Sequence, residues 1–129
     1  MAQIKIYGLK SHLDPIKKAL SDTIHACVME ALQYPKEKRA HRFFGLEPSD
    51  FFYPADRSEN YLILEISMFE GRSVDTKKAL LRLLFQKIKT EIGIQEQDVE
   101  MTITETPRHS WGFRGLLGDE AELDYKVNL

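Results

Sequence analysis

Two arginines are the side chains in this sequence best suited to holding a small anion. Arg42 alternates with Phe43 in an extended segment, and Arg72 stands at a turn that precedes a helical pattern. Arginine stays charged at neutral pH and holds a carboxylate through two parallel hydrogen bonds. Because arginine is rarely buried without a partner, we expect Arg42 in a pocket or an interface. For Arg72, a pocket and a plain surface position are both open.

An aromatic hairpin is the second feature with chemical potential. Trp111 and Phe113 flank Gly112, and Arg114 follows directly. Large aromatic rings in such a hairpin form either the apolar wall of a ligand site or a plug in a packed interface. Arg114 can pair with Glu70 or with the acidic segment near the end of the chain.

The remaining reactive residues point to no metal, disulfide or nucleic acid. The four histidines lack the spacing of a metal site, so no metal is expected. Cys27 is the one cysteine and falls on an apolar helical stripe, which predicts a core position. The segment 36–42 is basic, but the net charge of −2 argues against binding to nucleic acid.

The elements that must position these residues occur in two copies. In the first, a strand near residues 4–7 precedes a helix, with Asp14 as its cap and Pro15 as its first residue, and a strand follows at 39–46. In the second, a strand at 61–69 precedes a helix that starts at Ser73, and a strand follows at 98–105. The tetrapeptide KKAL recurs in both helices, so the chain contains an internal repeat.

These two repeats predict an α+β fold. Two β-α-β units with right-handed crossovers join into a four-stranded mixed sheet with two helices on one face. We expect one domain over residues 1–129, divided into repeat one (3–48), a connecting loop with an aromatic anchor (49–60), repeat two (61–107), and a C-terminal hairpin and tail (108–129). The strands carry apolar residues toward both faces, which predicts a partner subunit on the uncovered face.

Length and composition are those of an ordinary globular domain. The chain has 129 residues, of which 43% are hydrophobic and 29% are charged. No apolar run approaches the roughly 20 residues that span a bilayer, so no membrane partner is expected. The first residues lack a basic segment followed by an apolar stretch, which predicts a cytoplasmic location.

Three motifs at fixed spacing carry a resemblance to a known family. They are EGRS at 70–73, a strand ending in TITE at 102–105, and WGFRG at 111–115. They resemble the tautomerase superfamily, which has the fold of macrophage migration inhibitory factor and 4-oxalocrotonate tautomerase. The resemblance is strong over residues 66–115. Weaker identity over 4–47 extends it to a two-copy arrangement like that of malonate semialdehyde decarboxylase, and the whole chain resembles a small bacterial family with this fold.

The resemblance implies a homotrimer whose pockets lie between subunits and need no cofactor. In that family an amino-terminal proline acts as base or acid, arginines hold a carboxylate, and an aromatic residue forms a wall. The pattern assigns the arginine roles to Arg42 and Arg72, and the wall to Trp111 with Phe113. Position 2 carries Ala2 in place of proline.

The Ala2 departure has a chemical consequence: if Met1 is removed, the terminal group is the primary amine of Ala2. Three further positions depart from the family pattern. Glu70 replaces the first of the decarboxylase's two arginines at this turn, and a lysine of segment 35–39 stands where the decarboxylase has a carboxylate. Glu100 occupies, in the second repeat, the position that Arg42 has in the first.

The leading interpretation is a tautomerase-like protein that binds a small carboxylate or keto/enol acid. Its activity would be that of a tautomerase or decarboxylase, with the Ala2 amine as acid and base. The alternative is a catalytically silent trimer that binds a metabolite or another protein. Ala2 favours the silent protein, whereas Arg72 and Trp111 favour a pocket. A ferredoxin-like regulatory domain shares the repeat but does not explain EGRS or WGFRG.

Overall fold

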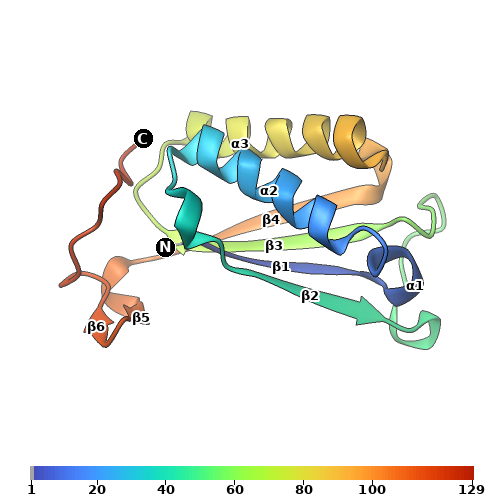
Figure 1. Ribbon diagram of the computed structural model, residues 1–129, viewed down its shortest axis with the longest axis horizontal. Coiled ribbons are helices and arrows are strands. Elements are labelled where there is room, and N and C mark those ends of the chain that lie inside the picture. The colour runs from blue at the N-terminus through green and yellow to red at the C-terminus, as the bar shows by residue number, and fades with distance from the viewer. Residues whose placement is uncertain (1) are drawn as a thin grey trace.

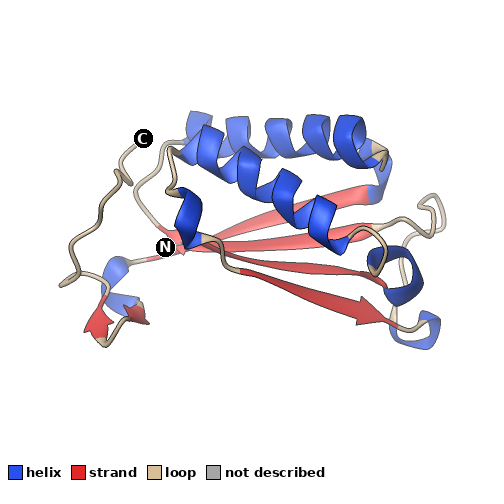
Figure 2. Cartoon of the chain, in the orientation of Figure 1, coloured by secondary structure: helices blue, strands red, loops and turns tan. Residues whose placement is uncertain are grey.

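The computed structural model describes residues 2–129, which form a four-stranded sheet with helices along one face (Figures 1 and 2). A two-stranded hairpin and an extended tail lie at the end of the sheet where the chain begins. The elements follow the order β1 (Ala2–Leu9), α1 (Lys10–Leu13), α2 (Lys17–Leu32), β2 (His41–Leu46), β3 (Leu62–Phe69), α3 (Val74–Lys87), β4 (Val99–Thr106), β5 (Gly112–Phe113) and β6 (Leu116–Leu117).

The sheet has the strand order β2-β1-β3-β4. Strands β1 and β2 are parallel, β3 and β4 are parallel, and the two repeats join through the antiparallel pair β1 and β3. This arrangement confirms the predicted mixed sheet built from two β-α-β units. It also sets Ala2 opposite Met68, so the start of the first repeat lies beside the end of β3, the first strand of the second repeat.

The core lies between the sheet and helices α2 and α3. Alternate residues of β1 and β3 point toward the helices and are fully buried, as Ile6 and Leu64 show. The helices contribute the apolar stripes that the sequence predicts, with Leu20, Ile24 and Leu32 from α2, and Leu80, Leu84 and Ile88 from α3 and the turn after it. Burial of these stripes holds the helices in place.

The face of the sheet away from the helices differs from the sequence expectation. Apolar residues were expected on both faces, but the middle of this face carries a charged row of Arg42, Lys5 and Glu65 on adjacent strands. Period-two alternation explains the row, because Lys5 and Glu65 lie between buried neighbours and Arg42 lies between half-buried ones. Apolar side chains gather at one end, where Tyr7 stacks on Phe44 at 4.8 Å.

The two helices begin in different ways. At α3, the Ser73 hydroxyl accepts a hydrogen bond from the Thr76 amide, which confirms the predicted start. At α2 the predicted cap is wrong: the Asp14 carboxylate instead binds Lys10 and Lys17, each at 2.8 Å, and the helix begins after Ile16 without a side-chain cap. Within residues 2–129, no helix has the length and apolar content to cross a bilayer.

Aromatic residues anchor the loop between β2 and β3, as predicted, but only two of the three aromatic residues at 51–53 take part. Phe51 is buried and packs against Tyr53 and Tyr61 with ring centroids 5.5 and 5.7 Å away. Phe52 is 90% exposed and takes no part in the anchor. The cluster fills the end of the sheet where β1 ends, far from Ala2.

Candidate functional site

Arg72 lies in a turn that brings it under the C-terminal tail. Gly71, with φ of 129°, allows the chain to turn sharply between β3 and α3. A Cβ atom at this position would approach Val127 to 3.2 Å, so the tail passes close over the turn. The antiparallel pairing of β1 and β3 places this turn at the same end of the sheet as Ala2.

The guanidinium of Arg72 is buried and only partly satisfied. The residue is 4% exposed, which excludes the surface position that the sequence left open. Its Nη1 donates to the Phe69 carbonyl at 3.4 Å, but Nε and Nη2 have no hydrogen-bond partner among the described residues. Burial lowers the pKa of Arg72, and nearby Tyr125, Tyr34 and Glu105 oppose that shift. Buried charge with unused donors is costly, and such donors suit an anionic ligand.

The nitrogen of Ala2 meets a buried phenol. It donates to the Tyr34 hydroxyl at 3.1 Å, and Tyr34 is 5% exposed. Gln33 ends α2 in a left-handed conformation, with φ of 51°, and turns the chain so that Tyr34 points back into the fold. Met1 lies outside the described residues, so the predicted removal of that residue stays a prediction.

The aromatic hairpin packs against the end of β3. The Phe69 ring, fully buried, meets Trp111 edge-on at 5.2 Å and Phe113 at 5.9 Å. Trp111 Nε1 is buried without a partner among residues 2–129. Arg108 holds this corner, since its guanidinium lies 5.5 Å from the Phe69 ring and donates to the carbonyls of Gly118 and Ala121.

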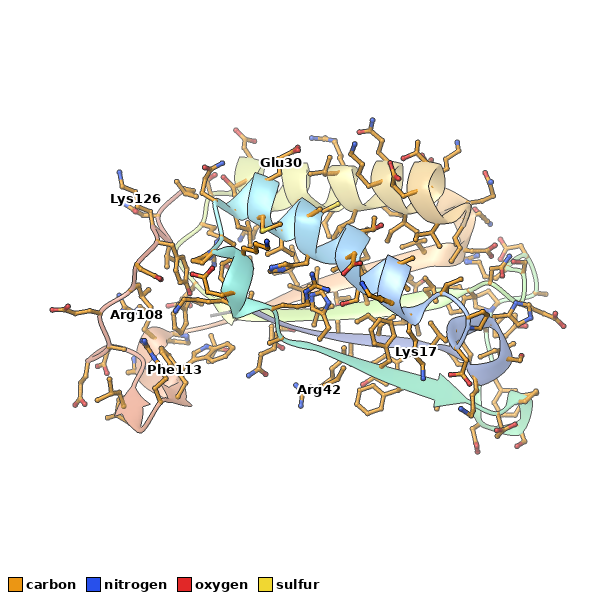
Figure 3. All side chains as sticks on the ribbon, in the orientation of Figure 1. Lys17, Glu30, Arg42, Arg108, Phe113 and Lys126 are labelled. Atoms are coloured by element: carbon orange, nitrogen blue, oxygen red, sulfur yellow. The ribbon has the colours of Figure 1, made fainter. Side chains whose placement is uncertain are left out.

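Arg42 occupies a different place from Arg72 within one chain. It is exposed on the sheet face away from the helices, where Nη2 donates to Gln3 Oε1 at 3.2 Å (Figure 3). Of the predicted site residues, Ala2, Arg72, Trp111 and Phe113 lie at one end of the sheet. Arg42 lies on the open face of the sheet, beside Gln3, the residue that follows Ala2 in β1.

The tail adds a cavity beside the candidate site. Tyr125, Phe113 and Arg114 line a cavity of about 260 Å³ together with Lys38 and other residues of the loop after α2. Lys38 forms an ion pair with Asp124 at 3.5 Å and lies over the Tyr125 ring. Arg114 Nη2 donates to the Glu122 carbonyl, so of the two pairings left open it takes the tail. The cavity therefore has aromatic and mainly basic walls, with Glu37 as the one acidic residue among the described lining residues.

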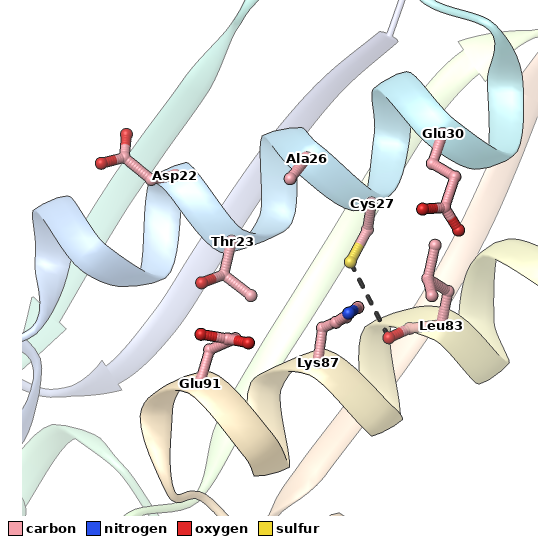
Figure 4. Close-up of a pocket in the computed structure, with 8 residues that line it drawn as sticks. All are labelled: Asp22, Thr23, Ala26, Cys27, Glu30, Leu83, Lys87 and Glu91. Atoms are coloured by element: carbon pink, nitrogen blue, oxygen red, sulfur yellow. Dashed lines mark hydrogen bonds between the residues drawn. The ribbon is translucent and has the colours of Figure 1, made fainter.

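A second cavity, between α2 and α3, lies apart from this end of the sheet (Figure 4). Cys27 lines it but is 1% exposed, as expected for a core residue, and its Sγ lies 3.8 Å from the Leu83 carbonyl oxygen. Burial raises the pKa of the thiol to about 11. The thiol is therefore protonated at neutral pH and is a poor nucleophile.

Sequence reasoning missed the two tyrosines of the site. Tyr34 follows the first helical pattern and Tyr125 lies near the end of the chain, and no motif of the sequence includes either residue. The ring centroids of Tyr34 and Tyr125 are 4.9 Å apart in an edge-on arrangement. An aromatic residue next to a predicted helix end was the available signal for Tyr34, but no pattern linked it to Ala2.

Comparison with known proteins identifies the family. A profile described as "Tautomerase enzyme" matches residues 38–114, more than half of the chain. The chain therefore belongs to the tautomerase family, as its motifs indicate. Among curated relatives it is 26% identical over 99 residues to "Probable tautomerase YusQ" of Bacillus subtilis (strain 168), which covers 73% of this chain and 78% of that protein.

Solved structures show the same fold over most of the chain. A malonate semialdehyde decarboxylase shares 22% identity with a TM-score of 0.79, covering 86% of this chain and 89% of the other. The FG41 malonate semialdehyde decarboxylase, solved as inhibited by 3-bromopropiolate, shares 26% identity with a TM-score of 0.77, covering 86% and 88%. A fused 4-OT, solved as an asymmetric trimer, shares 18% identity with a TM-score of 0.79, covering 92% and 97%.

Proposed function

We propose that this tautomerase-family protein binds a small carboxylate or keto/enol acid beside Arg72 and moves a proton on it. The observation that carries the proposal is the Arg72 guanidinium, 4% exposed with two nitrogens unpartnered among the described residues. A substrate carboxylate would satisfy both donors through a charge-assisted pair. Burial of the site strengthens that pair, because the local dielectric is low.

The Ala2 amine would be the proton carrier after removal of Met1. An α-amino group has an ordinary pKa of about 7.7–8.0, and burial near a cation lowers it, so a large share is unprotonated at neutral pH. The amine would take a proton from the carbon next to the carbonyl of a 2-oxo acid. It would return the proton to the oxygen, which gives the enol with no other reactant. Trp111 and Phe113 would provide the apolar wall.

A homotrimer would complete the site. The fused 4-OT structures with this fold are trimers, which supports the same assembly here. The open sheet face adds an argument, since Arg42 and Lys5 make one side of it basic and Glu65 makes the other side acidic, while Glu100 is paired with Arg57. Copies arranged head to tail would set opposite charges together. In that ring Arg42 of one copy would assist Arg72 of another.

Ala2 itself supports a second candidate, a trimer that binds a carboxylate metabolite or a protein without catalysis. A primary amine lacks the fixed ring of a proline, and Glu70 brings no second cation to the turn. In that case Arg72 would still bind its anion, but no proton would move. Both candidates therefore bind a carboxylate, but only the first converts it to product.

The test is the ketonisation of phenylenolpyruvate by the native protein. We expect Arg72→Ala to lower kcat/KM about ten- to hundred-fold, which is the loss of a charge-assisted pair. Arg82→Ala, at an exposed position of α3, is the matched control and should leave the rate unchanged. Ala2→Pro should raise the rate about ten-fold or more. Absence of turnover in both native protein and Ala2→Pro, with a carboxylate still bound, would favour the silent protein.

A further inference from the structure

The Ala2 nitrogen has a partner that nothing in the proposed reaction uses. Its N–H donates to the Tyr34 hydroxyl at 3.1 Å, inside the fold, where both residues are 5% exposed. A primary amine turns freely about its bond to Cα, so its hydrogens and lone pair have no fixed direction. A buried hydrogen bond to one N–H removes that freedom, because buried polar groups retain their partners.

The Tyr34 hydroxyl is itself held in place. The hydroxyl of Tyr125 donates to it, and the two rings meet edge-on at 4.9 Å. Burial raises the pKa of both phenols, so both are protonated at neutral pH. The Tyr34 oxygen thus accepts from two sides, and the tail that carries Tyr125 supports the contact with Ala2.

We infer that Tyr34 is a positioning residue for the Ala2 amine, accepting one N–H and directing the remaining positions of the nitrogen toward the ligand space beside Arg72. The inference rests on the proposed role of that amine. Acceptance of an N–H also favours the ammonium form, which opposes the effect of Arg72 on the amine. Tyr34 would therefore keep the amine able both to take and to return a proton near neutral pH.

Other charged groups at this end of the sheet also affect the equilibrium between the ammonium and amine forms of Ala2. Glu105 of β4 faces Arg72 but is bound by Lys77 at 2.6 Å, and Asp124 of the tail is bound by Lys38. Both carboxylates are thus partly neutralised. Arg72 and Tyr34 are left as the opposing influences on the amine, one cationic and one accepting a hydrogen bond.

The test measures the pKa of the Ala2 amine without any substrate. The amine is acetylated in competition with a reference amine at a series of pH values, and mass spectrometry of the N-terminal peptide gives the extent. Tyr34→Phe should lower the pKa of the amine by about 0.5 to 1, the effect of one lost hydrogen bond. Tyr125→Phe should lower it less, and Tyr53→Phe, in the aromatic anchor of the loop, should leave it unchanged.

The outcomes separate this inference from the proposed function. An amine pKa in Tyr34→Phe equal to that of the native protein, with an unchanged circular-dichroism spectrum, overturns the inference even if keto acids are turned over. Retention of Met1 in the mature protein also overturns it, because Ala2 would then contribute a peptide nitrogen. The expected shift in a protein that turns over no keto acid supports the inference and contradicts the catalytic proposal.

Discussion

The guanidinium of Arg72 and the carbonyl oxygen of Phe69 lie 3.4 Å apart, at the long end of the hydrogen-bond range. Phe69 also forms, through its ring, the surface on which Trp111 packs. One residue at the end of β3 therefore joins the cationic and the aromatic parts of the site. A ligand bound by the free nitrogens of Arg72 would lie close to the side chain that reports on it by fluorescence.

Removal of the Arg72 charge should stabilise the fold. Arg72→Met keeps much of the side-chain volume and removes a buried charge that no described carboxylate pairs with. We expect the free energy of unfolding to rise by about 1–3 kcal/mol in urea, while carboxylate binding is lost. Arg82→Met, at an exposed site, should change it by no more than about 0.5 kcal/mol. A clear destabilisation by Arg72→Met would show that Arg72 is structurally paired.

The hairpin depends on a close approach at Gly118. A Cβ there would overlap the Arg108 carbonyl and lie 2.9 Å from Trp111 Cβ. Gly118→Ala should therefore cost about 2–3 kcal/mol and shift Trp111 emission toward that of exposed tryptophan. Gly112→Ala is the matched control, since its nearest atom, the Leu116 oxygen, is 3.9 Å away. Equal effects of the two variants would contradict the packing described here.

Assembly should respond to the charged row on the open sheet face. Light scattering of the native chain should give three times 15.0 kDa, about 45 kDa. Glu65→Lys makes the row of Arg42, Lys5 and position 65 wholly basic, and should weaken association about ten-fold or more at low salt. Glu30→Lys, on the helical layer, should have no effect. A native mass near 15 kDa at micromolar concentration would rule out the trimer.

Stability should fall in mild acid because of His41. Burial, with His25 and Arg39 nearby, lowers its pKa from 6.5 to about 4. Between these two values the unfolded chain binds the proton more readily, so stability is lost as the pH falls from about 6.5 to 4. The loss attributable to this partly exposed ring is about 1–2 kcal/mol. In urea unfolding, the free energy of unfolding of His41→Asn should fall by that much less than the native value between pH 6.5 and 4. An identical fall in both proteins would exclude His41 as the cause.

The architecture could be predicted because it depends on local patterns. The period-two strands, the stripe ending at Leu32 and the cap at Ser73 are encoded within short segments. The start of α2 was mispredicted, since Asp14 is as well satisfied by two lysines as by a helix terminus. Tyr34 and Tyr125 could not be placed, because their contacts join residues far apart in sequence and depend on the path of the tail.

Fluorescence titration of the lone tryptophan shows whether Arg72 binds a small carboxylate. Pyruvate and malonate are titrated while the emission of Trp111 is followed. We expect saturable quenching, a Kd about ten- to hundred-fold weaker in Arg72→Ala, and partial recovery in Arg72→Lys, which restores the charge but not the two-pronged geometry. No quenching by either acid, or the same Kd in native protein and Arg72→Ala, would contradict this role of Arg72.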